Sequence, residues 1–159
     1  MSITPCLWFN NNAVEAATFY TSLFPNSRLL TEIPAPGDNP STKAGDVMMV
    51  DVELDGQRLT LLNGGPQFPF TEAVSFVFPC ASQADADHYY DALVADGGEE
   101  GQCGWLKDRF GLSWQVIPAE MGKYLGSSDP EGAARAMQAM LQMRRIDLET
   151  LRRAYEGEQ

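Results

Sequence analysis

The chain has 159 residues, 44% of them hydrophobic, which is the size and composition of one ordinary globular domain. Its 22 acidic residues outnumber the 11 basic ones and give a formal net charge of −11, so a nucleic acid would meet repulsion instead of a basic patch. No apolar run approaches the roughly 18 residues of a membrane span, and residues 1–5 lack the basic and apolar parts of a leader peptide. We therefore expect a cytoplasmic protein whose partners include neither nucleic acid nor membrane.

The first half of the chain predicts a strand, a helix and three more strands. Residues 3–9 form an apolar run that stops at a group of asparagines, which is typical of a strand. The hydrophobic period then becomes helical up to Pro25, and Asn12 with Glu15 resembles a capping box at the start of that helix. Three further strands are expected at residues 28–33, 46–54 and 58–62. Asp55-Gly56 is a strong signal for the hairpin between the last two.

The second half repeats this order. Residues 73–78 predict a strand, and Ser82 with Asp85 predicts the start of a helix that Gly97-Gly98 closes. Two strands are expected at residues 101–106 and 112–117, joined by a turn through residues 107–111. Because residues 4–9 align on 73–78 with both helices in register, we infer an internal duplication that produces two stacked modules.

The remaining segment predicts a helical tail. Asp129-Pro130 is a typical helix start, and a second helix is expected from Asp147. The predicted apolar stripe of the first helix is Ala133, Met137, Met140 and Leu141. The predicted inner face of the second helix is Leu148, Leu151 and Tyr155. A methionine stripe at this spacing is more typical of packing than of a ligand site, so we interpret the tail as a docking or dimer element.

Four segments carry a family resemblance. They are Ile3–Phe9, the Phe-Tyr and Phe-Pro pairs at residues 19–25, Leu62–Pro66 and, as the most specific, Gln102–Gln115. Together they resemble the PhnB-like branch of the vicinal oxygen chelate superfamily, which includes glyoxalases, extradiol dioxygenases, and fosfomycin and bleomycin resistance proteins. Some members of the branch carry the name 3-demethylubiquinone-9 3-methyltransferase.

The resemblance implies an α+β fold in which two βαβββ modules form a cupped mixed sheet around a cavity, and commonly a homodimer. We accordingly expect a glyoxalase-like domain at residues 1–126, with modules at about 1–66 and 67–126. A helical C-terminal extension is expected at residues 127–159.

The metal positions of the family can be compared with this chain one by one. The matching residues are Thr4, Ala73 and Gln115, with the fourth position near Thr60. Only Gln115 is a plausible ligand, and one neutral amide cannot retain a divalent ion where about three or four imidazole or carboxylate donors are needed. His88, the only histidine, falls on the polar face of a predicted helix. The sequence thus predicts no metal and no cofactor.

Residues that share the parity of these metal positions point to the same side of the sheet. They offer aromatic surface with a few hydroxyl and amide groups, which suits a small, planar, modestly polar molecule. Our candidate ligand-binding residues are Cys6, Trp8, Asn63, Ser75, Trp105, Ser113 and Gln115. Two alternatives stay open: Trp8 and Trp105 simply fill the cup, and the glycines after Asn63 form either an anion cradle or only a tight turn.

The three cysteines, Cys6, Cys80 and Cys103, are an odd number without the close pairs of a zinc site, so we expect reduced thiols. No histidine or lysine lies near Cys6 in the sequence, which favours an inert thiol over a nucleophile.

The main functional hypothesis is a metal-free binding protein for a small planar ligand. One alternative is an isomerase, lyase or dioxygenase with an atypical metal site that uses Gln115 and loop carboxylates such as Glu72. Another is methyl transfer to a demethylubiquinone, although Gly64-Gly65 does not lead into the helix that a typical methyl-donor site needs. The last alternative is a purely structural dimer with no ligand.

Overall fold

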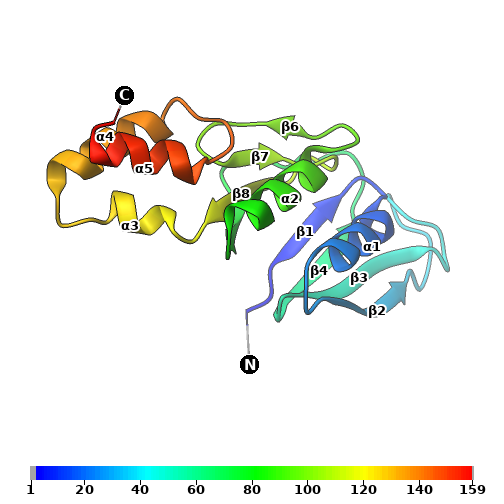
Figure 1. Cartoon of the computed structure of the whole chain (residues 1–159). Coiled ribbons are helices and arrows are strands. Elements are labelled where there is room, and N and C mark those ends of the chain that lie inside the picture. Colours follow the sequence, from blue (N-terminus) through cyan, green and yellow to red (C-terminus); the bar gives the residue numbers. More distant parts are fainter. Residues whose placement is uncertain (1–2, 159) are drawn as a thin grey trace. The chain divides into compact units, whose positions relative to one another are not determined.

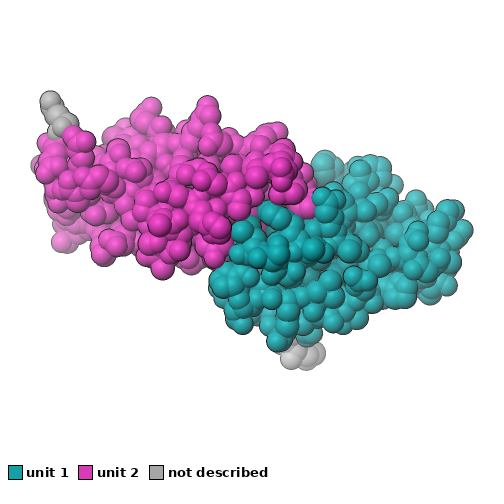
Figure 2. Space-filling view, turned by 45° about the vertical axis from the view of Figure 1, so that its right-hand side comes forward, with its two compact units in different colours: residues 1–70 teal, residues 71–159 magenta. Residues whose placement is uncertain are grey.

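The computed structural model describes residues 3–158 (Figure 1). The chain forms two compact units, residues 1–70 and residues 71–159, coloured teal and magenta in Figure 2. Each unit contains its own four-stranded mixed sheet. The division into a domain at residues 1–126 and an extension at 127–159 stays a prediction. No helix of the described residues is both long and apolar enough to cross a membrane.

Unit 1 has the predicted order of one strand, one helix and three strands. Its elements are β1 (Cys6–Phe9), α1 (Ala13–Leu23), β2 (Arg28–Pro34), β3 (Val47–Leu54) and β4 (Gln57–Asn63). The strand order is β1-β4-β3-β2, with β1 parallel to β4 and the other pairs antiparallel. Asp55 and Gly56 both have positive φ, which is the conformation of the predicted two-residue hairpin.

Unit 2 repeats this topology, as the predicted duplication requires. Its elements are β5 (Ser75–Cys80), α2 (Gln83–Val94), β6 (Glu99–Glu100), β7 (Trp105–Lys107) and β8 (Ser113–Pro118), and the strand order is β5-β8-β7-β6. In both units the α+β arrangement leaves one sheet face under a helix, where apolar side chains such as Phe9, Leu61, Leu106 and Val116 are buried.

The predicted strand at residues 101–106 is correct only at its end, where Trp105 and Leu106 belong to β7, because the chain turns in its middle. Cys103 and Gly104 both have positive φ, which interrupts an extended strand. Their amides donate to the carbonyls of Met143 and Arg144 at 2.8 and 2.7 Å, respectively. Carbonyl groups of the tail therefore accept the hydrogen bonds that a neighbouring strand would otherwise accept.

The predicted capping box of α1 is also wrong. Within residues 3–158, the Asn12 side chain accepts no hydrogen bond from the start of the helix. Asn63, at the end of β4, serves instead: its Oδ1 accepts from the Ala13 amide at 2.9 Å, and its Nδ2 donates to the Val47 carbonyl at 2.9 Å. The other predicted helix starts are confirmed, with side-chain caps from Ser82, Asp129 and Asp147.

Three helices follow β8: α3 (Met121–Leu125), which was not predicted from the sequence, and the two tail helices α4 (Pro130–Met140) and α5 (Leu148–Glu156). These helices pack around a small core of Ala136, Ile146 and Leu151. The predicted inner face of α5 is confirmed, since Leu151 is buried and Leu148 and Tyr155 pack on this core.

The stripe predicted for α4 is only partly correct. Gly132 and Ala136 are buried, whereas Met137 and Leu141 are 43% and 47% exposed. A Cβ on Gly132 would lie 2.7 Å from the Tyr155 ring, so α5 approaches α4 where α4 carries small side chains. The bulky Met137 and Leu141 side chains are accordingly turned outward.

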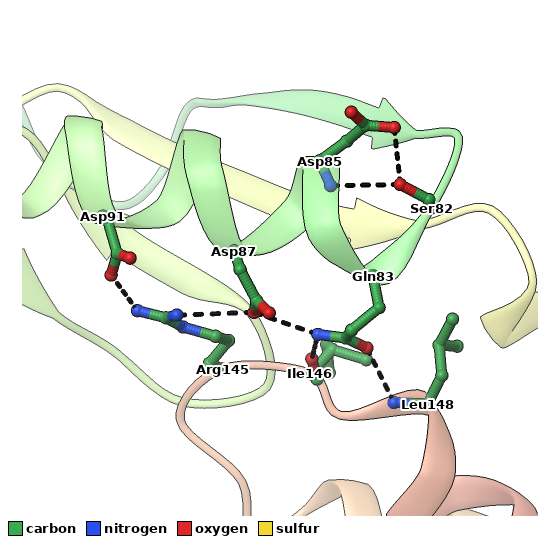
Figure 3. Close-up of polar contacts among 8 residues, drawn as sticks. All are labelled: Ser82, Gln83, Asp85, Asp87, Asp91, Arg145, Ile146 and Leu148. Atoms are coloured by element: carbon green, nitrogen blue, oxygen red, sulfur yellow. Dashed lines mark hydrogen bonds and ion pairs between the residues drawn. The ribbon is translucent and has the colours of Figure 1, made fainter.

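Polar contacts attach the tail to α2 (Figure 3). Gln83 Nε2 donates to the Ile146 carbonyl at 2.9 Å, and Gln83 Oε1 accepts from the Leu148 amide at 2.9 Å. The guanidinium of Arg145 pairs with Asp87 at 3.3 Å and with Asp91. One glutamine on α2 therefore satisfies backbone groups on both sides of the start of α5.

We expect the Gln83→Ala variant to lose at least about 2 kcal/mol of unfolding free energy, because its two hydrogen bonds to the tail backbone, of about 1 kcal/mol each, disappear together with a third bond to Asp87. Hydrogen exchange at the Leu148 amide should accelerate more than exchange in β3. Gln102→Ala is the control, since Gln102 is exposed. Unchanged protection of the Leu148 amide would contradict this role of Gln83.

Candidate ligand-binding site

The candidate residues lie mainly on the sheet face opposite α1 in unit 1 and opposite α2 in unit 2, which we call the open face of each sheet. In unit 1, β1 buries Leu7 and Phe9 and turns Cys6 and Trp8 to the opposite face. In unit 2, β8 buries Trp114 and Val116 under α2, which places Ser113 and Gln115 on the open face.

Unit 2 brings four of the predicted residues together. Ser75 pairs with Ser113 across the parallel β5–β8 ladder, and Trp105 pairs with Gln115 across the antiparallel β7–β8 ladder. Gln115 Nε2 donates to Ser75 Oγ at 2.9 Å. Their side chains therefore form one continuous patch of aromatic, amide and hydroxyl groups.

Ser113 is the unusual member of this patch. The residue is only 1% exposed, and its Oγ has no hydrogen-bond partner among residues 3–158. A buried hydroxyl without a partner costs about 1–3 kcal/mol. Such a group is expected where an external molecule completes the hydrogen bonding.

A pocket of about 160 Å³ opens beside Ser113, at the edge of the unit 2 sheet. Its charged and aromatic lining consists of Glu72, Glu99, Glu100, Trp105 and Lys107. Lys107 Nζ lies 2.6 Å from Glu72 Oε1. The hydrogen bond from Lys107 holds the pKa of Glu72 below its ordinary value, and the same bond raises the pKa of Lys107.

Sequence reasoning did not propose Lys107, Glu99 or Glu100 for the site. The register supplies the missing signal for two of them, because Lys107 pairs with Ser113 on one side and with Glu99 on the other. A hairpin alignment of β7 and β8 would have placed Lys107 on the face that carries Ser113.

Trp8 in unit 1 is held mainly by its own neighbours. Its Nε1 donates to the Gly65 carbonyl at 2.8 Å, and its ring meets the Phe68 ring edge-on at a centroid distance of 4.9 Å. The Gly64 and Gly65 amides donate to the Phe9 carbonyl at 3.0 and 3.2 Å. These amides are already used, so the structure favours the tight turn over the anion cradle.

Asn63 does not join the open-face residues. It pairs with Phe9 on the face that α1 covers, and both ends of its amide are used by Ala13 and Val47. His88 is exposed on α2, away from the unit 2 open face.

The thiols differ in their surroundings. Cys6 is exposed, yet partial burial and then the charge of Asp51 raise its pKa. Burial followed by the charge of Asp85 raises the pKa of Cys80 to about 11. Both shifts disfavour the thiolate, which is the nucleophilic form.

At pH 8 we therefore expect iodoacetamide to modify Cys6 slowly and Cys80 almost not at all. The Cys80 thiolate fraction should stay near one part in a thousand, three pH units below a pKa of about 11. Mass spectrometry of tryptic peptides measures both rates, with the urea-unfolded protein as the control. Equal rates for Cys6 and Cys80 in the folded protein would contradict this prediction.

The residues at the family's metal positions do not fit a divalent ion. Thr4 and Ala73 are exposed, and the Thr60 hydroxyl donates to Asp51 at 2.7 Å. Among residues 3–158, no three histidine, cysteine, aspartate or glutamate side chains come together in a metal-binding group. The amide of Gln115 alone is too weak a donor set for a first-row metal.

Comparison with known proteins places this geometry in a family. Residues 1–117 match the family described as 3-demethylubiquinone-9 3-methyltransferase. A structure from Bacillus cereus, described as a 3-demethylubiquinone-9 3-methyltransferase and PhnB protein, is 30% identical, with a TM-score of 0.67, and the match covers 75% of this chain and 100% of that one. Protein PA1353 from Pseudomonas aeruginosa is 25% identical, with a TM-score of 0.59, over 74% of this chain and 97% of that one.

The fold extends to more distant proteins. The fosfomycin resistance protein FosX from Listeria monocytogenes, solved with Mn(II) and sulfate, has a TM-score of 0.54 at 12% identity, over 79% of this chain and 95% of that one. No curated protein matches the chain. The repeated βαβββ topology and these matches agree with the resemblance of the sequence, and the chain belongs to the 3-demethylubiquinone-9 3-methyltransferase family, the PhnB-like branch of the vicinal oxygen chelate superfamily.

Proposed function

We propose that this protein binds a small planar organic ligand without a metal, on the open face of the unit 2 sheet. The carrying observation is the pocket that combines the Trp105 ring with the buried, partnerless hydroxyl of Ser113. A planar molecule that stacks on an aromatic ring is bound favourably, and a single buried polar group fixes the orientation of that molecule. Gln115 and Ser75 extend the same face with further polar groups.

Tryptophan fluorescence tests the proposal. We expect saturable quenching by a panel of planar aromatic compounds at about one site per chain, and loss of the quenching in Trp105→Leu. Val74→Thr is the control, since Val74 is exposed and does not line the pocket. If no compound in a broad panel alters the fluorescence, the proposed function fails.

We also propose that the protein is a cytoplasmic homodimer. Met137 and Leu141, exposed on α4, support a second copy as the partner. Light scattering at several protein concentrations measures the mass, and a monomer at all of them would count against this part of the proposal.

The family description raises methyl transfer as a second candidate. The structure does not support methyl transfer. The amides of Gly64 and Gly65 donate to protein carbonyls, and the turn continues into Pro66 instead of the helix that a typical methyl-donor site needs. Calorimetry with S-adenosylmethionine discriminates the two candidates, and we expect no binding heat. Binding of S-adenosylmethionine at one molecule per chain would favour methyl transfer.

A further inference from the structure

The charge of the unit 2 pocket narrows the class of ligand. Three glutamates, Glu72, Glu99 and Glu100, and one lysine, Lys107, line the pocket. Two of the carboxylates have partners, because Glu72 pairs with Lys107 at 2.6 Å and Glu100 pairs with Arg144 at 3.1 Å. Within residues 3–158, Glu99 forms no ion pair. One negative charge at the pocket is therefore left over.

Among the described residues, the pocket thus combines a carboxylate without an ion pair, a buried hydroxyl without a hydrogen-bond partner and an aromatic ring. Glu99 stands opposite Lys107 in the β6–β7 ladder, and Lys107 stands opposite Ser113 in the β7–β8 ladder. The Ser113 hydroxyl is buried without a partner, as described above. Trp105 lies two residues before Lys107 on β7 and faces the same side of the sheet.

We propose that this pocket takes a planar aromatic monocation, with its ring on Trp105, its positive charge toward Glu99, and a polar ring atom bonded to Ser113 Oγ. The inference rests on the proposed function and specifies its ligand. A cation is attracted both by the unpaired carboxylate and by the face of the tryptophan ring. An anion would have to displace Glu72 from Lys107 and would still be repelled by the unpaired charge of Glu99.

The test compares three probes of similar shape: proflavine, a cation at pH 7; acridone, which is neutral; and anthracene-9-carboxylate, an anion. Probe anisotropy is titrated against the full chain. We expect proflavine to bind about tenfold more tightly than acridone, from one ion pair and one cation–π contact, and the anion to bind most weakly. The preference for proflavine should shrink as salt is raised from 0.05 to 0.5 M, because salt screens exposed charges.

Two variants locate the site. Glu99→Gln should weaken proflavine about threefold and leave acridone unchanged, with Glu131→Gln as the matched control on the exposed start of α4. Ser113→Ala should weaken both probes while thermal stability holds or rises, since an unsatisfied buried hydroxyl is removed. If Ser113 had only a structural role, its replacement would not weaken probe binding while thermal stability holds or rises.

The outcomes separate the inference from the proposed function. Equal affinity for all three probes, or tightest binding of the anion, overturns the inference and keeps the binding function. Proflavine binding that ignores both Glu99→Gln and Ser113→Ala overturns the inference, because the cation then binds elsewhere. Failure of every probe overturns both.

Discussion

Replacing Asp108 by alanine is expected to lower the free energy of unfolding by about 4 kcal/mol. Asp108 is only 2% exposed. Its Oδ1 accepts from the amides of Phe110 at 2.8 Å and Leu112 at 3.1 Å, and its Oδ2 accepts from Trp114 Nε1 at 2.9 Å. Alanine would leave these three donors in the turn between β7 and β8 without an acceptor.

The same turn fixes the register of the proposed pocket, since Lys107 precedes it and Ser113 follows it. Urea denaturation followed by far-UV circular dichroism measures the loss. Asp108→Asn keeps an acceptor for the two amides but places an NH₂ group in the site, so we expect about half the effect. Glu15→Ala, on the exposed face of α1, is the control. A loss below 1 kcal/mol for Asp108→Ala would show that other groups hold the turn.

The two-residue period of the strands predicted which way the site residues face. Leu7, Phe9, Trp114 and Val116 are apolar and alternate with Cys6, Ser113 and Gln115, so burying the apolar set under a helix fixes the direction of the rest. The parity of the family's metal positions and the alternation of side chains along a strand were sufficient to group these residues on one face. The alternation holds along β1 and β8, whereas Asn63 on β4 lies on the face that α1 covers.

The predictions that were wrong depend on contacts between distant segments. Asn63 caps α1 from 50 residues away, which a search for capping residues next to the helix cannot find. Residues 103 and 104 bond to the tail instead of to a strand. On α4, the small residues Gly132 and Ala136 are buried where Tyr155 packs, although hydrophobicity alone favoured Met137.

The charged pocket could be predicted only after the register of β6, β7 and β8 was known. Glu99, Lys107 and Ser113 are separated by 14 residues of chain, yet they are neighbours across two ladders. The wrong strand boundary at residues 101–106 shifted that register. Without the correct register, Lys107 was assigned to a turn, and nothing in the sequence linked Glu99 to the site.

Replacing Gly64 by alanine is expected to cost about 3 kcal/mol, the upper range for overpacking a filled site. An ideal Cβ at this position would lie 2.2 Å from Cε2 and 2.4 Å from Cδ2 of Trp8. The backbone cannot easily yield, because the Gly64 amide donates to the carbonyls of Phe9 and Leu62. The indole must therefore move, which breaks its bond to the Gly65 carbonyl and its edge contact with Phe68.

A double-mutant cycle tests whether Trp8 is the cause. Gly64→Ala should cost much less in a Trp8→Ala background, since the atoms that obstruct the new methyl group are gone. Gly37→Ala is the control: a Cβ there meets nothing within 4 Å, so its effect should stay within about 0.5 kcal/mol. If Gly64→Ala costs the same with and without the indole, the clash lies elsewhere. The glycine pair would then be needed for its backbone conformation, which Gly65 at a φ of 92° requires in its own right.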